Sequence, residues 1–143
     1  MLSQTSKTAI KAVIYLSGKS KLNERAGIKD VSRKINASEH TVGKILQNLV
    51  RHGFLNSTKG PNGGFFLEEE QQERVIYDIV VAIEGDSIFK QCGLGLTKCS
   101  ADHPCPIHDD YKVVKDLLLK TFKEKRIKDL VEPVEDGIAY LIG

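Results

Sequence analysis

The sequence lacks any apolar run long enough to cross a membrane. No stretch of the 143 residues approaches the roughly 20 uninterrupted apolar residues that a membrane-spanning helix needs. An apolar patch lies at residues 12–16, but Lys7 and Lys11 interrupt the apolar character of this end, and no small-residue cleavage site follows. We therefore expect a soluble protein that is not exported.

Cysteine is also scarce, and it is confined to one place. The three cysteines all lie in CGLGLTKCSADHPCPIH, residues 92–108. An odd number of cysteines cannot pair fully within the chain, and without a secretory signal the cytoplasm, where thiols stay reduced, is the expected compartment. The sulfur atoms are therefore expected to be reactive or metal-bound rather than cross-linked.

Acidic residues are missing from the N-terminal end, where the first is Glu24. Residues 1–60 carry eleven Lys or Arg and three Asp or Glu, whereas residues 61–143 carry ten and sixteen. A basic N-terminal half favours a polyanion such as double-stranded DNA, because each neutralised phosphate releases a condensed counterion. On charge alone, an ordinary solvated surface is the alternative.

The fingerprints of enzymes are absent as well. The segment KGPNGG, residues 59–64, is not followed by the Gly-Lys-Ser/Thr of a P-loop, and the chain has no flavin or nicotinamide fingerprint and no nucleophile–base pairing. We therefore expect no catalytic activity. The alternative from another class is a small redox or electron-transfer protein that uses the cysteine segment.

What the first half does contain is helical periodicity. Apolar spacing predicts a core helix over residues 3–18 and a short helix from Ile28 to Ile35, followed by a third helix with Ser38 as its N-cap. The third helix has an apolar stripe at i, i+3, i+4, i+7 and i+8: Val42, Ile45, Leu46, Leu49 and Val50. Two short helices joined by a tight turn, the second exposing polar and basic side chains, predict a helix-turn-helix (HTH). An ordinary helical hairpin is the alternative.

A hairpin is predicted directly after this helix. Two strand-like runs, residues 54–58 and 65–67, flank the turn-forming segment KGPNGG. A hairpin in this position predicts the wing of a winged helix, with Lys59 at its tip able to reach a minor groove. A further helix over residues 75–84 is expected to pack under the wing.

The C-terminal part predicts a helix that is apolar over most of its circumference, at residues 109–128. Such a helix must be buried, and a second copy of the chain would bury it. We therefore expect a homodimer, which also suits an HTH protein that reads paired half-sites. The central helix of a larger core is the alternative. Apolar residues from Ile127 to Leu141 predict a last helix, interrupted near Pro133.

The expected fold is mainly α with a small β-hairpin: a winged HTH domain plus a long C-terminal dimerisation helix. We divide the chain into a winged-helix DNA-binding domain at residues 1–85, a cysteine-rich sensor loop at residues 86–108, and the dimerisation and C-terminal helices at residues 109–143.

The cysteine segment offers a set of metal ligands, Cys92, Cys99, Cys105 and His108. Six residues separate the first two cysteines, five the next two, and two the last cysteine from the histidine. Thiolates are the usual ligands of iron–sulfur clusters, and three cysteines with a histidine can also hold tetrahedral zinc. Zinc sites more often show spacings of about two to four residues, so an iron–sulfur cluster is favoured. Zinc and uncoordinated redox-sensing thiols remain the alternatives, and Gly93 and Gly95 are expected to permit the turns of the loop.

These features, in this order, resemble the Rrf-two family of bacterial transcription regulators. The resemblance runs from about residue 3 to residue 130 and is most specific in the wing KGPNGGFFL, followed by the helix end VVAIEGD and the cysteines. The family includes regulators of iron–sulfur cluster assembly, nitric-oxide-responsive repressors and cysteine-metabolism repressors. The resemblance implies a dimeric, sequence-specific repressor with a long dimerisation helix and, as in several members, an iron–sulfur cluster in the loop before that helix.

The resemblance also implies roles for individual residues on the DNA side. It puts Ser38, His40, Thr41 and Lys44 on the face that enters the major groove, and Lys59 in the minor groove. The chain departs from the pattern in the third helix, where it has glycine at position 43 and many relatives have a glutamate that helps to select the site. The operator sequence is therefore not implied.

In the loop, His108 matches the fourth ligand of the cluster assembly regulators. Some nitric-oxide-sensing relatives instead use an acidic residue from the first helix of the partner subunit, but the first predicted helix here has no acidic residue. His103, Asp102 and Asp109 are the other candidates for this position.

Overall fold

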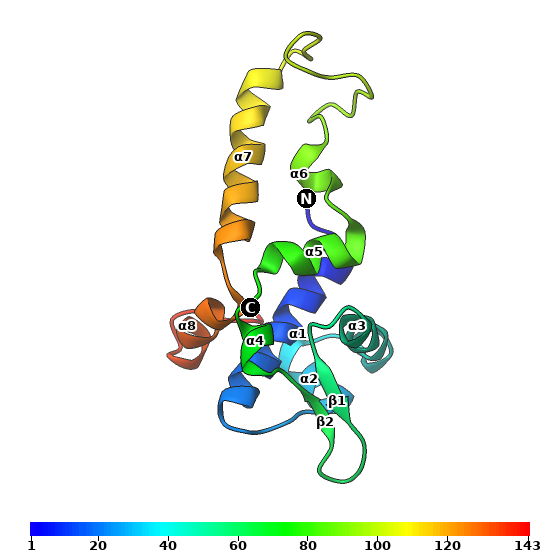
Figure 1. The fold of residues 1–143 in the computed structure, drawn as a ribbon, viewed down its shortest axis with the longest axis vertical. Coiled ribbons are helices and arrows are strands. Elements are labelled where there is room, and N and C mark those ends of the chain that lie inside the picture. Colours follow the sequence, from blue (N-terminus) through cyan, green and yellow to red (C-terminus); the bar gives the residue numbers. More distant parts are fainter.

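Eight α-helices, one 3₁₀ helix and a two-stranded hairpin form the fold, in a computed structural model that describes residues 1–143. In chain order the elements are α1 (Gln4–Lys21), α2 (Ile28–Ile35), α3 (Glu39–Arg51), β1 (Asn56–Thr58), β2 (Gly64–Phe66), α4 (Glu69–Gln72), α5 (Ile76–Glu84), α6 (Ser87–Lys90), α7 (His108–Glu124), η1 (Ile127–Leu130) and α8 (Val131–Glu135) (Figure 1).

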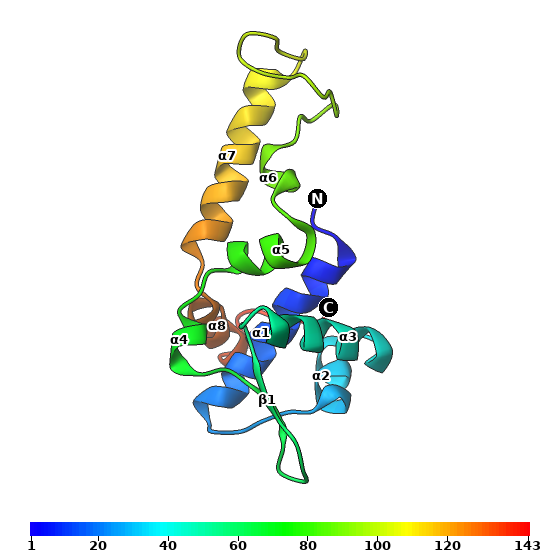
Figure 2. The ribbon, with the colours of Figure 1, turned by 45° about the vertical axis from the view of Figure 1, so that its right-hand side comes forward.

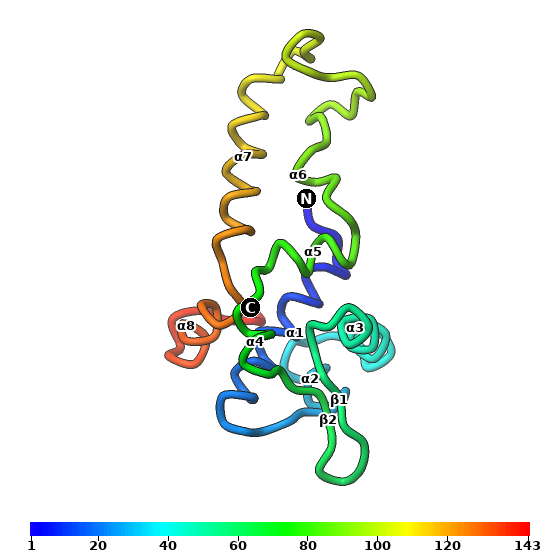
Figure 3. Tube along the Cα trace, viewed as in Figure 1, coloured from blue at the N-terminus to red at the C-terminus, as the bar shows by residue number.

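Two parts are separated along the longest axis of the molecule. We call residues 1–84 and 127–143 the body, and residues 85–126 the arm. The arm runs out along α6, turns through the cysteine loop at residues 91–107, and returns along α7 (Figure 3). The β1–β2 hairpin lies at the opposite end of the axis from the cysteine loop in both views (Figures 1 and 2).

The core of the body is built around α1. Ala9, Ala12, Val13 and Leu16 have no exposed surface, and they share one cluster with apolar side chains of α2, α3, α5 and η1. Burying a side chain such as leucine contributes about 1.5–3 kcal/mol, so this cluster holds the body together. The helix is longer than predicted and continues past Gly18 to Lys21.

The predicted HTH is confirmed by α2 and α3. The first of these helices ends at Ile35, and its C-cap Asn36 adopts the left-handed conformation that turns the chain. The second begins at its N-cap, Ser38, whose side-chain oxygen accepts a hydrogen bond from the Thr41 backbone N–H at 3.2 Å. Four of the five predicted apolar positions of α3 are buried and Val50 is half-buried.

The predicted hairpin is confirmed as well, although its strands are shorter. β1 and β2 pair antiparallel with Ser57 opposite Phe65. The preceding residues Phe54 and Leu55 are not in the strand, because their side chains turn into the core, where each is 1% exposed. The apolar part of the predicted run therefore anchors the hairpin, and only its polar part forms the projecting strand.

The position predicted for α5 under the wing is wrong. This helix packs against α1 and α7, and its residues Ile76, Ile79 and Val80 are buried. Periodicity identified the buried face correctly, but periodicity carries no information about which element covers that face. As a result, α5 joins the body to the arm.

The arm is tied to the body at its base. The backbone N–H of Ile76 donates to the carbonyl of Lys125 at 3.0 Å, and that of Ile127 donates to the carbonyl of Arg74 at 2.9 Å. Glu73 forms an ion pair with Arg126 at 2.8 Å. Helix α7 therefore ends at Glu124, before the predicted end at residue 128. The chain that follows it pairs with the segment that precedes α5.

The predicted last helix is also wrong in part. Pro133 is the third residue of α8, where its missing N–H costs nothing because the first turn of a helix has no internal acceptors for its N–H groups. The helix does not extend to Leu141. It stops at Glu135, and Gly137 follows with a φ of 71°.

The boundaries that the sequence suggested for the domains fall near the ends of elements, since α5 ends at Glu84 and α7 begins at His108. The division itself stays a prediction. None of the helices is both long enough and apolar enough to cross a membrane.

Candidate functional site

The N-terminal half of α3 presents the side chains predicted to read DNA. Ser38, His40, Thr41 and Lys44 are all exposed. The hydroxyl of Ser38 also donates to Thr41 Oγ1 at 2.8 Å, so two of these polar side chains are oriented before any ligand binds. Glu39 is exposed beside them in the first turn.

Gly43 lies where α3 faces the neighbouring helix α2. A Cβ built on this glycine would lie 3.4 Å from Ile28 Cδ1 on α2. The missing side chain therefore faces the neighbouring helix, and a small side chain would fit there in ordinary van der Waals contact.

The wing tip lies away from the core. Lys59 is exposed in the turn between β1 and β2, and the hairpin projects beyond the rest of the body (Figure 2). The structure thus presents an exposed lysine on each of two elements of the body, Lys44 in the first half of α3 and Lys59 at the wing tip.

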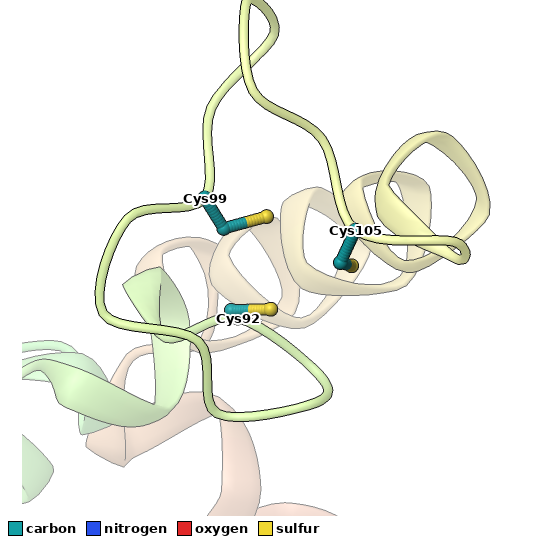
Figure 4. Close-up of side chains that lie close together, drawn as sticks. All are labelled: Cys92, Cys99 and Cys105. Atoms are coloured by element: carbon teal, nitrogen blue, oxygen red, sulfur yellow. The ribbon is translucent and has the colours of Figure 1, made fainter.

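The three cysteines gather at the far end of the arm. The Sγ atoms of Cys92, Cys99 and Cys105 all lie within 4.8 Å of one another, and the three side chains point toward a common space (Figure 4). Cys92 follows α6, and Cys105 comes shortly before α7. Residues thirteen positions apart in the sequence are therefore brought together by a loop that folds back on itself.

One histidine lies beside this group, next to Cys99. His108, the first residue of α7, places Nδ1 at 3.2 Å from Cys99 Sγ. His103, the alternative ligand, is exposed and its backbone pairs with Ser100. Neither Asp102 nor Asp109 belongs to the group of donors, and both are exposed.

The electrostatic environment differs between the cysteines. The backbone N–H of Leu96 points at the Cys92 sulfur and, with the N–H of Leu94, lowers the pKa of that thiol to about 7. Desolvation by burial raises the pKa of the Cys105 thiol, and its two cysteine neighbours add to this rise. Metal binding requires the thiolate, and the Cys92 thiol loses its proton more readily than the Cys105 thiol.

Side chains of α7 hold the start of the loop in place. A Cβ on Gly93 would lie 2.8 Å from the ring of Tyr111, so only glycine lets the loop backbone rest on that ring. One turn later, Lys115 Nζ donates to the carbonyl of Lys90 at 3.1 Å. The expectation that both glycines permit turns is confirmed: Gly93 lies in a turn closed by the Gly95 N–H, which donates to the carbonyl of Cys92 at 2.9 Å, and Gly95 has a φ of 75°. Nothing in the local sequence indicates the contact with Tyr111, which lies eighteen residues away.

Comparison with known proteins agrees with this architecture. Residues 2–133 match the Rrf2 family, described as iron-dependent transcriptional regulators. A protein of Aquifex aeolicus that is assigned as an HTH-type transcriptional regulator is 30% identical over 135 residues, which cover 92% of this chain and 91% of that protein.

Two solved structures show the same fold. The structure of CymR, the global cysteine regulator of B. subtilis, aligns with a TM-score of 0.74 at 19% identity, over 92% of this chain and 96% of the other. That of T. potens IscR aligns with a TM-score of 0.73 at 16% identity, over 97% and 91%. The expectation of a regulator rather than an enzyme is confirmed by the family. The chain belongs to the Rrf2 (Rrf-two) family, and it is a winged-helix transcriptional regulator that binds DNA.

Proposed function

We propose that this regulator is a homodimeric repressor whose affinity for DNA depends on an iron–sulfur cluster held by the cysteine loop. The observation that carries the proposal is the convergence of three Sγ atoms within 4.8 Å of one another. His108 supplies a nitrogen donor beside them. A set of thiolates and an imidazole fits such a cluster, which when bound supplies a redox-active centre sensitive to its ligands and solvent exposure.

The ligand residues would connect parts of the arm that are otherwise far apart in the chain. Cys92 continues from α6, and His108 begins α7, so shared ligation by these two residues would close the loop on both helices. Release of either residue would leave the end of α6 attached only through its contacts with α7. The state of the loop would thereby set how rigidly α6 and α7 are held together, and this difference would appear as a difference in DNA affinity.

The exposed face of α7 supports a homodimer. No residue of α7 is buried within the chain, and Val113, Val114 and Leu117 are 67%, 58% and 63% exposed. A run of large apolar side chains on one exposed helix indicates an interface. A second copy related by a two-fold axis would cover both faces at once and give two HTH units for paired half-sites.

The DNA contacts proposed for the body follow from exposure and charge. Ser38, His40, Thr41 and Lys44 on α3 would enter the major groove, where polar side chains distinguish base edges. Lys59 on the wing would enter the minor groove, where narrow A·T-rich DNA attracts cations. The cytoplasm is the compartment in which we expect this to take place.

Anaerobic purification with quantification of iron and sulfide tests the cofactor. We expect both elements in the wild-type protein, a visible absorption band that accompanies them, and loss of both in Cys92→Ser, Cys99→Ser and Cys105→Ser. Ser100→Ala, in the same loop, is the matched control and is expected to keep them. Zinc in place of iron would establish the structural-zinc alternative, and metal-free protein would leave the redox-thiol alternative.

The link to DNA is tested with the same proteins. A duplex enriched by the wild-type protein from a randomised pool is titrated with cluster-loaded and cluster-free protein. We expect the two affinities to differ by about 5- to 150-fold, the usual range of allosteric coupling. Equal affinities would contradict control by the cluster, even if the cluster is present.

A further inference from the structure

Arg25 spans both strands of the wing, although it lies outside the hairpin and outside the recognition helix. It belongs to the linker between α1 and α2. Its Nη1 donates to Oγ1 of Thr58 on β1 at 2.7 Å. Its guanidinium carbon lies 4.4 Å from the centre of the Phe66 ring on β2. One side chain therefore contacts the two strands through two different kinds of interaction.

The backbone next to Arg25 is attached to the same hairpin. The N–H of Phe65 donates to the carbonyl of Ala26 at 2.8 Å, and the N–H of Ala26 donates to the carbonyl of Phe65 at 3.3 Å. Gly64 has a φ of 140°, and a Cβ there would lie 2.8 Å from the Ala26 carbonyl oxygen. The linker thus lies against β2 through one antiparallel bridge, Ala26 to Phe65, which fixes the backbone next to the Arg25 side chain.

The charge of Arg25 has no acidic partner. No carboxylate lies within 4.0 Å of it, and the adjacent Glu24 is paired with Lys19 at 3.0 Å. Guanidinium is a planar group with five N–H donors, so it can stack on a ring and donate to a hydroxyl at the same time, whereas a lysine ammonium is a point charge on a flexible stem. The residue therefore matters here for its shape as well as its charge.

We propose that Arg25 is a positioning residue for DNA binding, which holds the wing so that Lys59, the residue after Thr58, reaches the minor groove. The proposal rests on the docking of Lys59 proposed above. An isolated two-stranded hairpin is marginal in water, and strands of three residues each have little to fix their direction. Arg25 connects that hairpin to the linker that leads into α2.

The test measures binding to the enriched duplex with A·T-rich flanks, using full-length Arg25→Lys and Thr58→Val. Both variants keep the net charge of the wild type and lose the contact. We expect each to weaken binding by about three- to tenfold, as for the loss of a hydrogen bond, with a shallower salt dependence, because Lys59 would no longer neutralise its part of the DNA charge. Arg33→Lys, an exposed arginine on α2, and Ser57→Ala, beside Thr58, are the matched controls and are expected to bind as the wild type.

A double-mutant cycle with Lys59→Ala separates positioning from direct contact. If Arg25 acts through Lys59, the Arg25→Lys exchange adds little to the loss already caused by Lys59→Ala. Wild-type binding by both Arg25→Lys and Thr58→Val, or independent multiplication of the two losses in the cycle, would overturn the proposal. Thermal unfolding checks that each variant is folded. If Arg25→Lys is not folded, the proposal is tested with Thr58→Val and with the double-mutant cycle of Thr58→Val and Lys59→Ala. Failure of Lys59→Ala itself to weaken binding would overturn the docking on which the proposal rests.

Discussion

The body and the arm of this regulator are stabilised in different ways. In the body, α1 and α3 bury apolar stripes in one shared core. In the arm, α7 is nearly as long as α1 and buries no residue. The contacts of the arm include the packing of the Phe89 ring against Phe122 at 5.6 Å and against Tyr77 of the body at 5.1 Å, and the polar contacts near the cysteines. The body therefore has a core of its own, whereas α7 carries exposed apolar side chains that the proposed second copy would cover.

The largest effect is expected from a cavity in the body. Leu46 has no exposed surface, so Leu46→Ala should lower the free energy of unfolding by about 2–5 kcal/mol. Leu96→Ala in the cysteine loop makes the same exchange at a side chain that is 49% exposed, and it should change the free energy by less than about 0.5 kcal/mol. Urea denaturation measures both free energies of unfolding. Equal effects of the two exchanges would contradict the difference in stabilisation between the body and the arm.

The second largest effect is expected on dimer formation rather than on folding. Replacing Val114 and Leu117 together by serine removes apolar surface from the exposed face of α7 and should raise the dimer dissociation constant about 100-fold or more. Analytical ultracentrifugation measures this constant. Lys120→Ser, on the same helix, should leave it near the wild-type value. A monomeric wild-type protein would show that α7 is covered by something other than its own copy.

A smaller effect is expected where the loop rests on α7. In Gly93→Ala the new Cβ would lie 2.8 Å from the Tyr111 ring, well inside the contact distance of about 3.5–4.0 Å. Relieving this overlap should cost about 1–3 kcal/mol and should lower the iron and sulfide bound per chain after anaerobic reconstitution. Thr97→Ala, exposed in the same loop, is the control. Undiminished iron and sulfide in Gly93→Ala would show that the contact with Tyr111 does not hold the ligand loop.

The smallest effect concerns the junction of α1 with the end of α5. Desolvation opposes ionisation of Glu84, but hydrogen bonds from Ser3 and Ser6, with the attraction of the N-terminal amino group, keep its pKa below the ordinary value of 4.5. A group with a lowered folded pKa contributes stability above its unfolded pKa and loses it as the pH falls through the folded pKa. Glu84→Gln should therefore be less stable than wild type at neutral pH, and this difference should shrink below pH 4.5.

Thermal unfolding of the two proteins across this pH range measures that difference. Glu132→Gln, at an exposed carboxylate on α8, is the matched control and should follow the wild type. A constant difference between Glu84→Gln and wild type at all pH values would show that the hydrogen bonds of Glu84 do not depend on its charge.

Which features could be predicted from the sequence depends on whether the residues that form them are close together in the chain. The HTH was predictable because the apolar period of α3 and the cap at Ser38 are local signals. The cysteine group was predictable as a set of residue types, and the structure brings its members together. The position of α5 and the contact of Gly93 with Tyr111 were not, because each depends on a neighbour that is distant in sequence. The contact between Arg25 and Thr58, which are 33 residues apart, carries no local pattern either.

The pairing at the base of the arm has one more consequence. The backbone at Val75 forms an antiparallel bridge with the backbone at Arg126. The two ends of the segment between these residues are therefore held side by side. The arm, residues 85–126, leaves the body after α5 and returns to it at this bridge. We expect that an arm of the same span with different residues at its tip could attach at these two points and leave the HTH and the wing unchanged.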